Sequence, residues 1–401
     1  MEFQTSEDTV PTGLISDELS RQLIGYPPAS GGWQDGDSVG DRKFTSRFDL
    51  ELEAGGRLSS AVIAYESWGE LNSEKSNAVL VLHALTGDSH TVGSASDAHP
   101  TNGWWDALIG PGKPIDTNKF FVVTPNIIGG CQGSTGPASL NRSGVEYGPN
   151  FPHLTIRDQT KSLDALTDFL EIPRWHSVIG GSMGGMHALE YAITKPEKLQ
   201  SLGILAAPAV SSADQIAINS IQVEAIRTDS QFHSGWYYDK KPGFGPHRGL
   251  ALARRMALLN YRSPQELNAR FQRSWQSGVS PFGEGGRFSI ESYLDFHGNK
   301  FTRRFDANSY IILAEAMNTH DVGRDRGGVE AALAQINVPT LVLGISSDRL
   351  FPVENQKLIA ENLGSELIGE GLQIIESEFG HDGFLIEKNE VGKHLKTLLE
   401  V

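Results

Sequence analysis

The feature that most constrains this sequence is a glycine-rich segment, residues 177–186, with the pattern G-x-S-x-G at Gly180, Ser182 and Gly184. An apolar β-branched run precedes the serine, and an apolar helical pattern follows it. A strand that turns sharply into a helix at a serine leaves no room for side chains two positions away on either side, so glycine is needed at both places. The segment therefore predicts a nucleophile elbow that exposes the Ser182 hydroxyl at the carboxyl end of a strand.

Apolar runs alternate with helical patterns along much of the chain. The predicted strands are residues 61–65, 78–82, 120–125, 177–179, 202–205, 340–345 and 372–375. The predicted helices are residues 160–170, 184–194, 215–228, 248–261 and 307–319. Near-continuous apolar strands separated by helices are typical of a mostly parallel sheet that is buried on both faces.

Together with the elbow, this alternation predicts an α/β-hydrolase fold. Helical patterns dominate between about residues 210 and 328, and the strand signal returns only at Thr340. We therefore expect a core formed by residues 42–209 and 329–401, with an inserted helical lid at residues 210–328. Residues 1–41 are polar and acidic, and we expect a flexible or loosely draped arm there.

A serine hydroxyl needs a base, and in this fold an acidic residue and then a histidine follow the serine along the chain. Asp348 ends the predicted strand region near residue 345, and His381 lies in a loop after the next strand. This order assigns His381 as the general base and Asp348 as the residue that orients it. Three aspartates remain alternatives for the acidic position: Asp321, Asp325 and Asp382.

An oxyanion hole requires two backbone donors. One is expected to be the N–H group of Met183, directly after the nucleophile. The other should come from the loop after an early strand, where we predict Leu85, with Ala84 or Thr86 as alternatives. No cluster of metal-ligand residues with convincing spacing is found, so no metal site is predicted. Residues 129–136 are glycine-rich but lack the lysine of a phosphate-binding loop.

Charge and cysteine content narrow the possible partners and location. The formal net charge of −15 disfavours nucleic acid and anionic membranes as partners. The only cysteine, Cys131, cannot form an intrachain disulfide, which fits a reducing compartment. Neither a signal-peptide layout nor an apolar stretch long enough for a transmembrane helix is found. We expect a cytoplasmic protein.

Beyond the elbow, longer segments from about Ser46 to the C-terminus resemble the homoserine O-acetyltransferases, acyltransferases of methionine biosynthesis with an α/β-hydrolase fold. The segments that carry this resemblance are residues 83–88, 104–113, 126–137, 151–159, 249–261, 305–310, 320–324 and 381–384. Together they are far more specific than the elbow alone. The first 45 residues lie outside the shared pattern.

The resemblance implies a ping-pong reaction in which Ser182 takes the acetyl group of acetyl-CoA and passes it to L-homoserine. It implies no bound cofactor, with acetyl-CoA as a co-substrate, and a homodimer formed through lid helices. It also implies that Arg254 binds the homoserine carboxylate with Tyr261 nearby, and that Asp382 binds the ammonium group. A guanidinium and a carboxylate are suitable partners for the two charges of an amino acid. Arg255 remains an alternative to its neighbour Arg254.

Three other functions remain open at this point. A serine esterase or thioesterase would use the same three residues and would differ only in admitting water to the acyl-enzyme. A transferase of the same family could use a succinyl donor or a serine acceptor. A non-enzymatic binding protein on the same scaffold is the third alternative, although such proteins commonly lose one of the three residues that are all present here.

Overall fold

An eight-stranded, mostly parallel sheet forms the centre of this computed structural model, which describes residues 23, 25–276 and 278–401. Its strand order is β1 (Lys43–Phe44), β4 (Ala64–Trp68), β8 (Phe121–Pro125), β5 (Ala78–Leu82), β9 (Trp175–Gly181), β10 (Leu199–Leu205), β11 (Thr340–Ile345) and β12 (Gln373–Ile375). The strands from β8 to β12 run parallel, whereas β4 is antiparallel to β8 and β1 to β4. Two small sheets pair β2 (Phe48–Glu51) with β3 (Arg57–Ala61) and β6 (Ile109–Gly110) with β7 (Ile115–Asp116).

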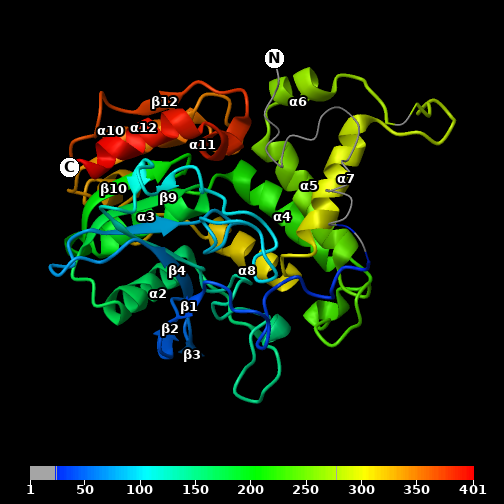
Figure 1. Cartoon of the computed structure of the whole chain (residues 1–401), viewed down its shortest axis with the longest axis horizontal. Coiled ribbons are helices and arrows are strands. Elements are labelled where there is room, and N and C mark those ends of the chain that lie inside the picture. The colour runs from blue at the N-terminus through cyan, green and yellow to red at the C-terminus, as the bar shows by residue number, and fades with distance from the viewer. Residues whose placement is uncertain (1–22, 24, 277) are drawn as a thin grey trace.

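Both faces of the sheet are buried, as the apolar runs predicted. Along β5, Leu80 and Leu82 belong to one apolar cluster and Val79 and Val81 to another, because successive side chains of a strand point to opposite faces. The first cluster includes α2 (Ile156–Phe169) and α3 (Met183–Thr194), and the second includes α12 (Lys388–Leu399). Figure 1 shows α2 and α12 on opposite sides of the strands. The structure therefore has the helix–sheet–helix layers of an α/β protein.

The chain between β10 and β11 is mainly helical. It contains α4 (Ala213–Arg227), α5 (His247–Tyr261), α6 (Pro264–Phe271), α7 (Ser289–Phe301), α8 (Ala307–Asn318) and the short α9 (Val329–Leu333). Helices α4 to α7 lie beside the sheet in Figure 1. After β11 follow α10 (Val353–Asn362) and α11 (Gly383–Ile386). We call the segment from α4 to α8 the lid. The domain boundaries at residues 209/210 and 328/329 stay a prediction.

Local signals explain where the lid helices begin. The Ser212 hydroxyl accepts the N–H of Gln215 while the Gln215 side chain accepts the N–H of Ser212, which forms a capping box at the start of α4. Asp306 caps α8 by accepting the N–H of Ser309. These caps fix the starts of α4 and α8, two of the helices that line the space beside Ser182.

One predicted strand, residues 61–65, is wrong in its extent. The structure divides this apolar run between the end of β3 and the start of β4. At the break the N–H groups of Val62 and Ile63 donate to the side-chain hydroxyls of Thr135 and Thr45 instead of to a neighbouring strand. These acceptors are distant in sequence, so a continuous apolar run gave no sign of the break.

Part of the predicted N-terminal arm packs against the lid and against the glycine-rich loop of residues 129–136. The Ser30 hydroxyl donates to Asp306 over 2.8 Å, and the Gly31 N–H donates to the carbonyl of Phe305 over 3.3 Å. The Trp33 N–H donates to the carbonyl of Cys131 over 2.8 Å. Residues 1–22 and 24 of the arm lie outside the described residues. Among the described residues, no helix combines the length and the apolar character needed to cross a membrane.

Candidate active site

Ser182 lies at a tight turn between β9 and α3, with φ 57° and ψ −125°. This conformation is strained for a residue with a side chain. The flanking glycines are required by close backbone contacts. A Cβ atom on Gly180 would lie 2.0 Å from the carbonyl oxygen of Gly184, and one on Gly184 would lie 2.1 Å from that of Leu82. The turn therefore holds the serine at the carboxyl end of β9 and the amino end of α3.

A chain of hydrogen bonds connects Ser182, His381 and Asp348. The serine Oγ lies 2.9 Å from Nε2 of His381, and Nδ1 of His381 lies 2.6 Å from Oδ2 of Asp348. A carboxylate only accepts, so Nδ1 carries the proton and Nε2 is free to accept the serine proton. The structure thus brings together three residues that are up to 199 positions apart in the sequence.

Asp348 is fixed for this role by its own contacts. Its Oδ1 atom accepts the N–H groups of Leu350 and Phe351, each over 2.9 Å, which leaves Oδ2 for His381. Two of the other acidic candidates lie elsewhere: Asp321 caps a turn through the Gly323 N–H, and Asp325 is an exposed residue near Arg324. The geometry therefore favours Asp348 over both.

Burial and charge act in opposite directions on His381. Burial lowers the pKa of its imidazole, but the charge and hydrogen bond of Asp348, helped by the charge of Asp382, outweigh burial, so the net pKa is raised. A raised pKa makes the imidazole a stronger proton acceptor. The arrangement can deprotonate Ser182 and stabilise the imidazolium that results.

The two predicted oxyanion donors flank Ser182. Met183 is the first residue of α3, where N–H groups have no acceptor within the helix and the helix dipole is positive. Leu85 lies in the loop after β5 and lines the same cavities as Ser182. His83 stabilises the start of that loop. Its Nε2 accepts the Ile127 N–H over 3.1 Å, and its Nδ1 donates to the Ala84 carbonyl over 2.7 Å. These hydrogen bonds anchor the loop where a donor is needed.

Ser182 and His381 open into a cavity with charged walls, which we call the charged cavity. The residues that give it its polar character are Arg254, Arg262, Asp382, Tyr261, Tyr293 and His297. The three predicted substrate-binding residues are all among them. Arg254 donates to the hydroxyl of Thr86 over 3.2 Å and lies over the rings of Tyr261 and Phe301. Burial raises the pKa of Tyr261 to about 12, so its hydroxyl stays neutral.

Arg255, the alternative to Arg254, points elsewhere. Its guanidinium pairs with Asp295 over 3.0 Å, and its side chain is 39% exposed. Arg254 and Tyr261 are seven residues apart on α5 and share one face of that helix, as the sequence predicted. The structure therefore directs Arg254, and not its neighbour, into the charged cavity.

Arg262 was missed by the sequence analysis. Its Nε atom lies 3.0 Å from Oδ2 of Asp382, so the predicted ammonium-binding carboxylate already has a cationic neighbour. His297 and Tyr293 of α7 were also missed. Nothing local marks these residues, because they reach the cavity only when α7 packs against α5.

The end of α5 is locked to the loop that carries His381. The Ser263 hydroxyl donates to the carbonyl of Glu378, and Arg262 pairs with Asp382. Between them Gly380, with φ 67°, approaches so closely that a Cβ atom would lie 2.6 Å from the carbonyl oxygen of Tyr261. Lid and catalytic loop therefore form one packed unit at this point.

A buried cluster of Glu66, His90 and His99 has side chains of the kinds that bind metals. The two imidazole rings are stacked, with centroids 3.9 Å apart and planes within 9° of each other. Because imidazole lone pairs lie in the ring plane, stacked rings cannot both direct them at one ion about 2.0–2.1 Å away. The Glu66 carboxylate instead accepts the Ser89 hydroxyl over 2.7 Å and lies 3.2 Å from Nδ1 of His90. The arrangement fits a hydrogen-bonded cluster behind the loop of Leu85 better than a metal centre.

Comparison with known proteins agrees with this geometry. A family model described as the α/β hydrolase fold matches residues 77–388. This protein therefore has the α/β-hydrolase fold, which confirms the predicted fold class. Its site contains a serine, a histidine and an aspartate joined by hydrogen bonds.

Curated relatives define the family more closely. The chain is 58% identical over 399 residues to a homoserine O-acetyltransferase of Leifsonia xyli subsp. xyli, covering 99% of each chain. It is 60% identical over 386 residues to one of Clavibacter michiganensis subsp. michiganensis, covering 96% of this chain and 99% of the relative. The chain belongs to the homoserine O-acetyltransferase family, as its motifs indicated.

Solved structures with the same fold include proteins named as homoserine O-acetyltransferases and proteins named as esterases. A homoserine O-acetyltransferase from Bacillus anthracis superposes with a TM-score of 0.81 at 27% identity, covering 90% of this chain and 97% of that one. Esterase E22 superposes with a TM-score of 0.79 at 26% identity, covering 89% and 99%. The fold alone therefore does not separate acyl transfer from hydrolysis.

Proposed function

We propose that this chain is a homoserine O-acetyltransferase that transfers acetyl from acetyl-CoA to the hydroxyl of L-homoserine, a step of methionine biosynthesis. The observation that carries the proposal is the charged cavity beside Ser182, which offers an amino acid both a guanidinium and a carboxylate. The near full-length identity to homoserine O-acetyltransferases supports the same substrates. No bound cofactor is required, because acetyl-CoA acts as a co-substrate.

In the first half-reaction His381 accepts the Ser182 proton while Oγ attacks the thioester carbonyl carbon. The N–H groups of Met183 and Leu85 stabilise the negative charge on the carbonyl oxygen of the tetrahedral intermediate. The carbon–sulfur bond then breaks, His381 protonates the leaving thiolate, and free CoA departs. Asp348 stays ionised and stabilises the imidazolium between these two proton transfers.

In the second half-reaction L-homoserine enters after CoA has left, and its hydroxyl attacks the acetyl group carried by Ser182. Arg254 binds the substrate carboxylate with Tyr261 nearby, and Asp382 binds the ammonium group next to His381. His381 removes the hydroxyl proton as the oxygen attacks the acetyl ester, and the same proton returns to Ser182 when its ester bond breaks. O-acetyl-L-homoserine leaves and the free serine is restored.

Arg254→Ala should weaken binding of the acceptor without blocking acylation. We expect the KM for L-homoserine to rise about tenfold to a hundredfold, since a hydrogen bond to a charged group is worth roughly 1.5–3 kcal/mol. The rate of the first CoA release, measured by rapid mixing without homoserine, should change little. Arg255→Ala is the matched control, because Arg255 pairs with Asp295 instead. Equal KM values for the two variants would contradict the assignment of Arg254.

The pH dependence should report the raised pKa of His381. Acylation needs the neutral imidazole, so the first CoA release should be fast at high pH and should slow as pH falls through a midpoint above the ordinary value of 6.5. Asp382→Asn removes one of the charges that raise this pKa and should move the midpoint to lower pH. Stopped-flow thiol release across a pH series measures both curves. An unchanged midpoint in the variant would contradict the electrostatic role of Asp382.

The esterase alternative is tested by the acceptor dependence of turnover. Thiol release from acetyl-CoA should be sustained only when L-homoserine is present, and O-acetylhomoserine should accumulate in equal amount. Steady release without an acceptor would instead indicate hydrolysis, which the similarity to esterase E22 keeps open. L-Serine, as a second acceptor, tests the choice of amino acid.

We also propose a homodimer formed through lid helices. Helices α4 and α5 pack together, and they expose four large apolar side chains: Ile216, Ile221, Leu252 and Leu259. Leu252 and Leu259 are seven residues apart and share one face of α5, which offers a partner chain an exposed apolar surface. Sedimentation should give the mass of two chains, and the double substitution Leu252→Glu and Leu259→Glu should shift it to one chain with an unchanged circular dichroism spectrum. A monomeric unsubstituted protein would refute the proposal.

The proposed location remains the cytoplasm. Cys131 is buried, and burial raises the pKa of its thiol, so it is protected from oxidation and needs no disulfide partner. The supporting argument is the lack of any second cysteine to pair with it.

A further inference from the structure

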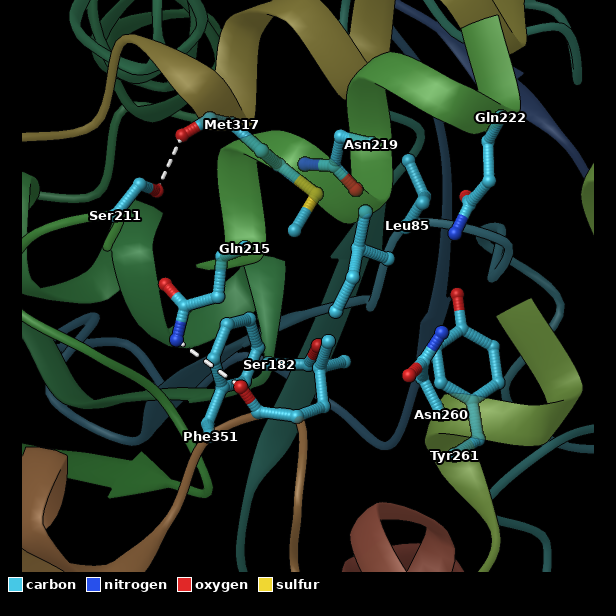
Figure 2. Close-up of a pocket in the computed structure, with 12 residues that line it drawn as sticks. Leu85, Ser182, Ser211, Gln215, Asn219, Gln222, Asn260, Tyr261, Met317 and Phe351 are labelled. Atoms are coloured by element: carbon cyan, nitrogen blue, oxygen red, sulfur yellow. Dashed lines mark hydrogen bonds between the residues drawn. The ribbon is translucent and has the colours of Figure 1, made fainter. Parts of the chain in front are cut away.

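Ser182 opens into a second cavity whose chemistry differs from that of the charged cavity. Figure 2 shows this space, which we call the amide cavity after Gln215, Asn219, Gln222 and Asn260. The first three residues are spaced four and three positions apart and lie on one face of α4. Leu85, Ser182 and Tyr261 line both cavities. The nucleophile therefore stands at the junction of a charged space and a neutral one.

The amides of this cavity are largely engaged with the protein. Nε2 of Gln215 donates to the carbonyl of Leu350 over 3.0 Å. Nδ2 of Asn219 donates to the side chain of Asn318 over 2.8 Å, and Oε1 of Gln222 accepts the Tyr310 hydroxyl over 2.5 Å. Amides held in this way do not require hydrogen bonds from a ligand. An apolar group in this cavity therefore leaves these amide atoms with the partners they already have.

No lysine, arginine, aspartate or glutamate lines the amide cavity within the described part of the chain. Its remaining walls include the apolar side chains of Met317, Ile218 and Phe351. It is also the smaller of the two spaces. A carboxylate placed here would be removed from water without a counter-ion, which is strongly unfavourable. A short neutral group suits the cavity.

We propose that the amide cavity is the acyl pocket, and that Met317 limits the length of the acyl chain it accepts. The inference rests on the proposed function and adds to it the residues that choose the acyl group. When the acyl carbonyl oxygen faces the N–H groups of Met183 and Leu85, the methyl group points into the amide cavity. The acceptor hydroxyl then approaches from the charged cavity, where His381 takes its proton and returns it to Ser182.

Met317 is suited to this role by its position. It lies near the end of α8, and in Figure 2 its thioether extends into the space beside Ser182. Its carbonyl accepts the Ser211 hydroxyl over 2.6 Å, which fixes the backbone independently of the side chain. Shortening the side chain therefore enlarges the amide cavity while the end of α8 keeps this anchor.

The test compares kcat/KM for acetyl-, butyryl- and succinyl-CoA with L-homoserine as acceptor. We expect Met317→Ala to raise the butyryl-to-acetyl ratio by about tenfold to a hundredfold, the range for a methylene or two in a fitted pocket. Met317→Val, which keeps more of the packing, should give an intermediate ratio. Asn219→Lys should raise the succinyl-to-acetyl ratio by placing a cation in the neutral space.

Leu258→Ala is the matched control, because Leu258 is a buried side chain of similar size that lines the charged cavity. Its butyryl-to-acetyl ratio should stay at that of the unsubstituted protein. Unchanged ratios in both Met317 variants would overturn the proposal. So would an equal shift in Leu258→Ala, or a KM change in the Met317 variants that is the same for every acyl-CoA, as expected if the cavity held the pantetheine arm. Failure of the proposed function is distinct, since the unsubstituted protein would then transfer no acyl group to homoserine.

Discussion

Replacing Ser182 with alanine is expected to lower kcat for acetyl transfer by about four to six orders of magnitude, as for other serine nucleophiles activated by a histidine and an aspartate. The change removes the atom that lies 2.9 Å from Nε2 of His381 and that would carry the acetyl group. Water and homoserine have no comparable position from which to attack the thioester directly. Thiol release and O-acetylhomoserine formation should both fall together to the small residual rate that binding and the oxyanion donors still support.

The fold of this variant should remain intact, because alanine fits the same turn. Its thermal unfolding midpoint should match that of the unsubstituted protein within a few degrees, so that lost activity cannot be attributed to lost structure. Ser182→Gly offers a further check, since glycine adopts φ 57° without steric cost and should relieve strain of about 1–3 kcal/mol. Activity retained within tenfold in Ser182→Ala would contradict the proposed acyl-enzyme.

Gly184→Ala should have the largest effect on stability. Its Cβ atom would lie 2.1 Å from the carbonyl oxygen of Leu82 and 3.0 Å from that of His83, and both are backbone atoms that cannot rotate away. Relief requires α3 to move away from β5 in the centre of the buried sheet. We expect a loss of about 4 kcal/mol or more in the free energy of unfolding, the range of severe core defects, or failure to fold.

Chemical denaturation compares this variant with Gly55→Ala as a control. Gly55 has a positive φ, of 91°, unlike the helical Gly184, and a Cβ atom there meets nothing within 4 Å. That substitution should cost only the backbone strain of about 1–2 kcal/mol. Similar losses for both variants would show that steric contact at the elbow is not the cause.

The central strands could be predicted from sequence because burial on both faces leaves a continuous apolar signal. The predicted residues 78–82 and 340–345 coincide with β5 and β11, in which every residue is buried. The nucleophile elbow, too, is encoded locally by its glycines. The two-residue strands β1, β6 and β7 were missed because such short elements carry no periodicity.

The site was predictable only where chain order or a motif determined it. The expected order of serine, aspartate and histidine led to Asp348 and His381, which the structure places in hydrogen-bond contact. The pairing of Arg262 with Asp382 and the cluster around Glu66 depend on contacts between distant segments. The amide cavity likewise exists only because α4 and α8 meet over Ser182, which neither helix pattern reveals.

The lock between the end of α5 and the loop of His381 has a consequence for the timing of turnover. Swinging the lid away at Tyr261 would pull on Gly380 and would separate His381 from Ser182, so an open lid and a working proton relay exclude each other at this hinge. Substrates and products are then expected to enter and leave through the openings of the two cavities while the lid stays closed. We therefore expect each catalytic cycle to proceed without a large movement of the lid at Tyr261.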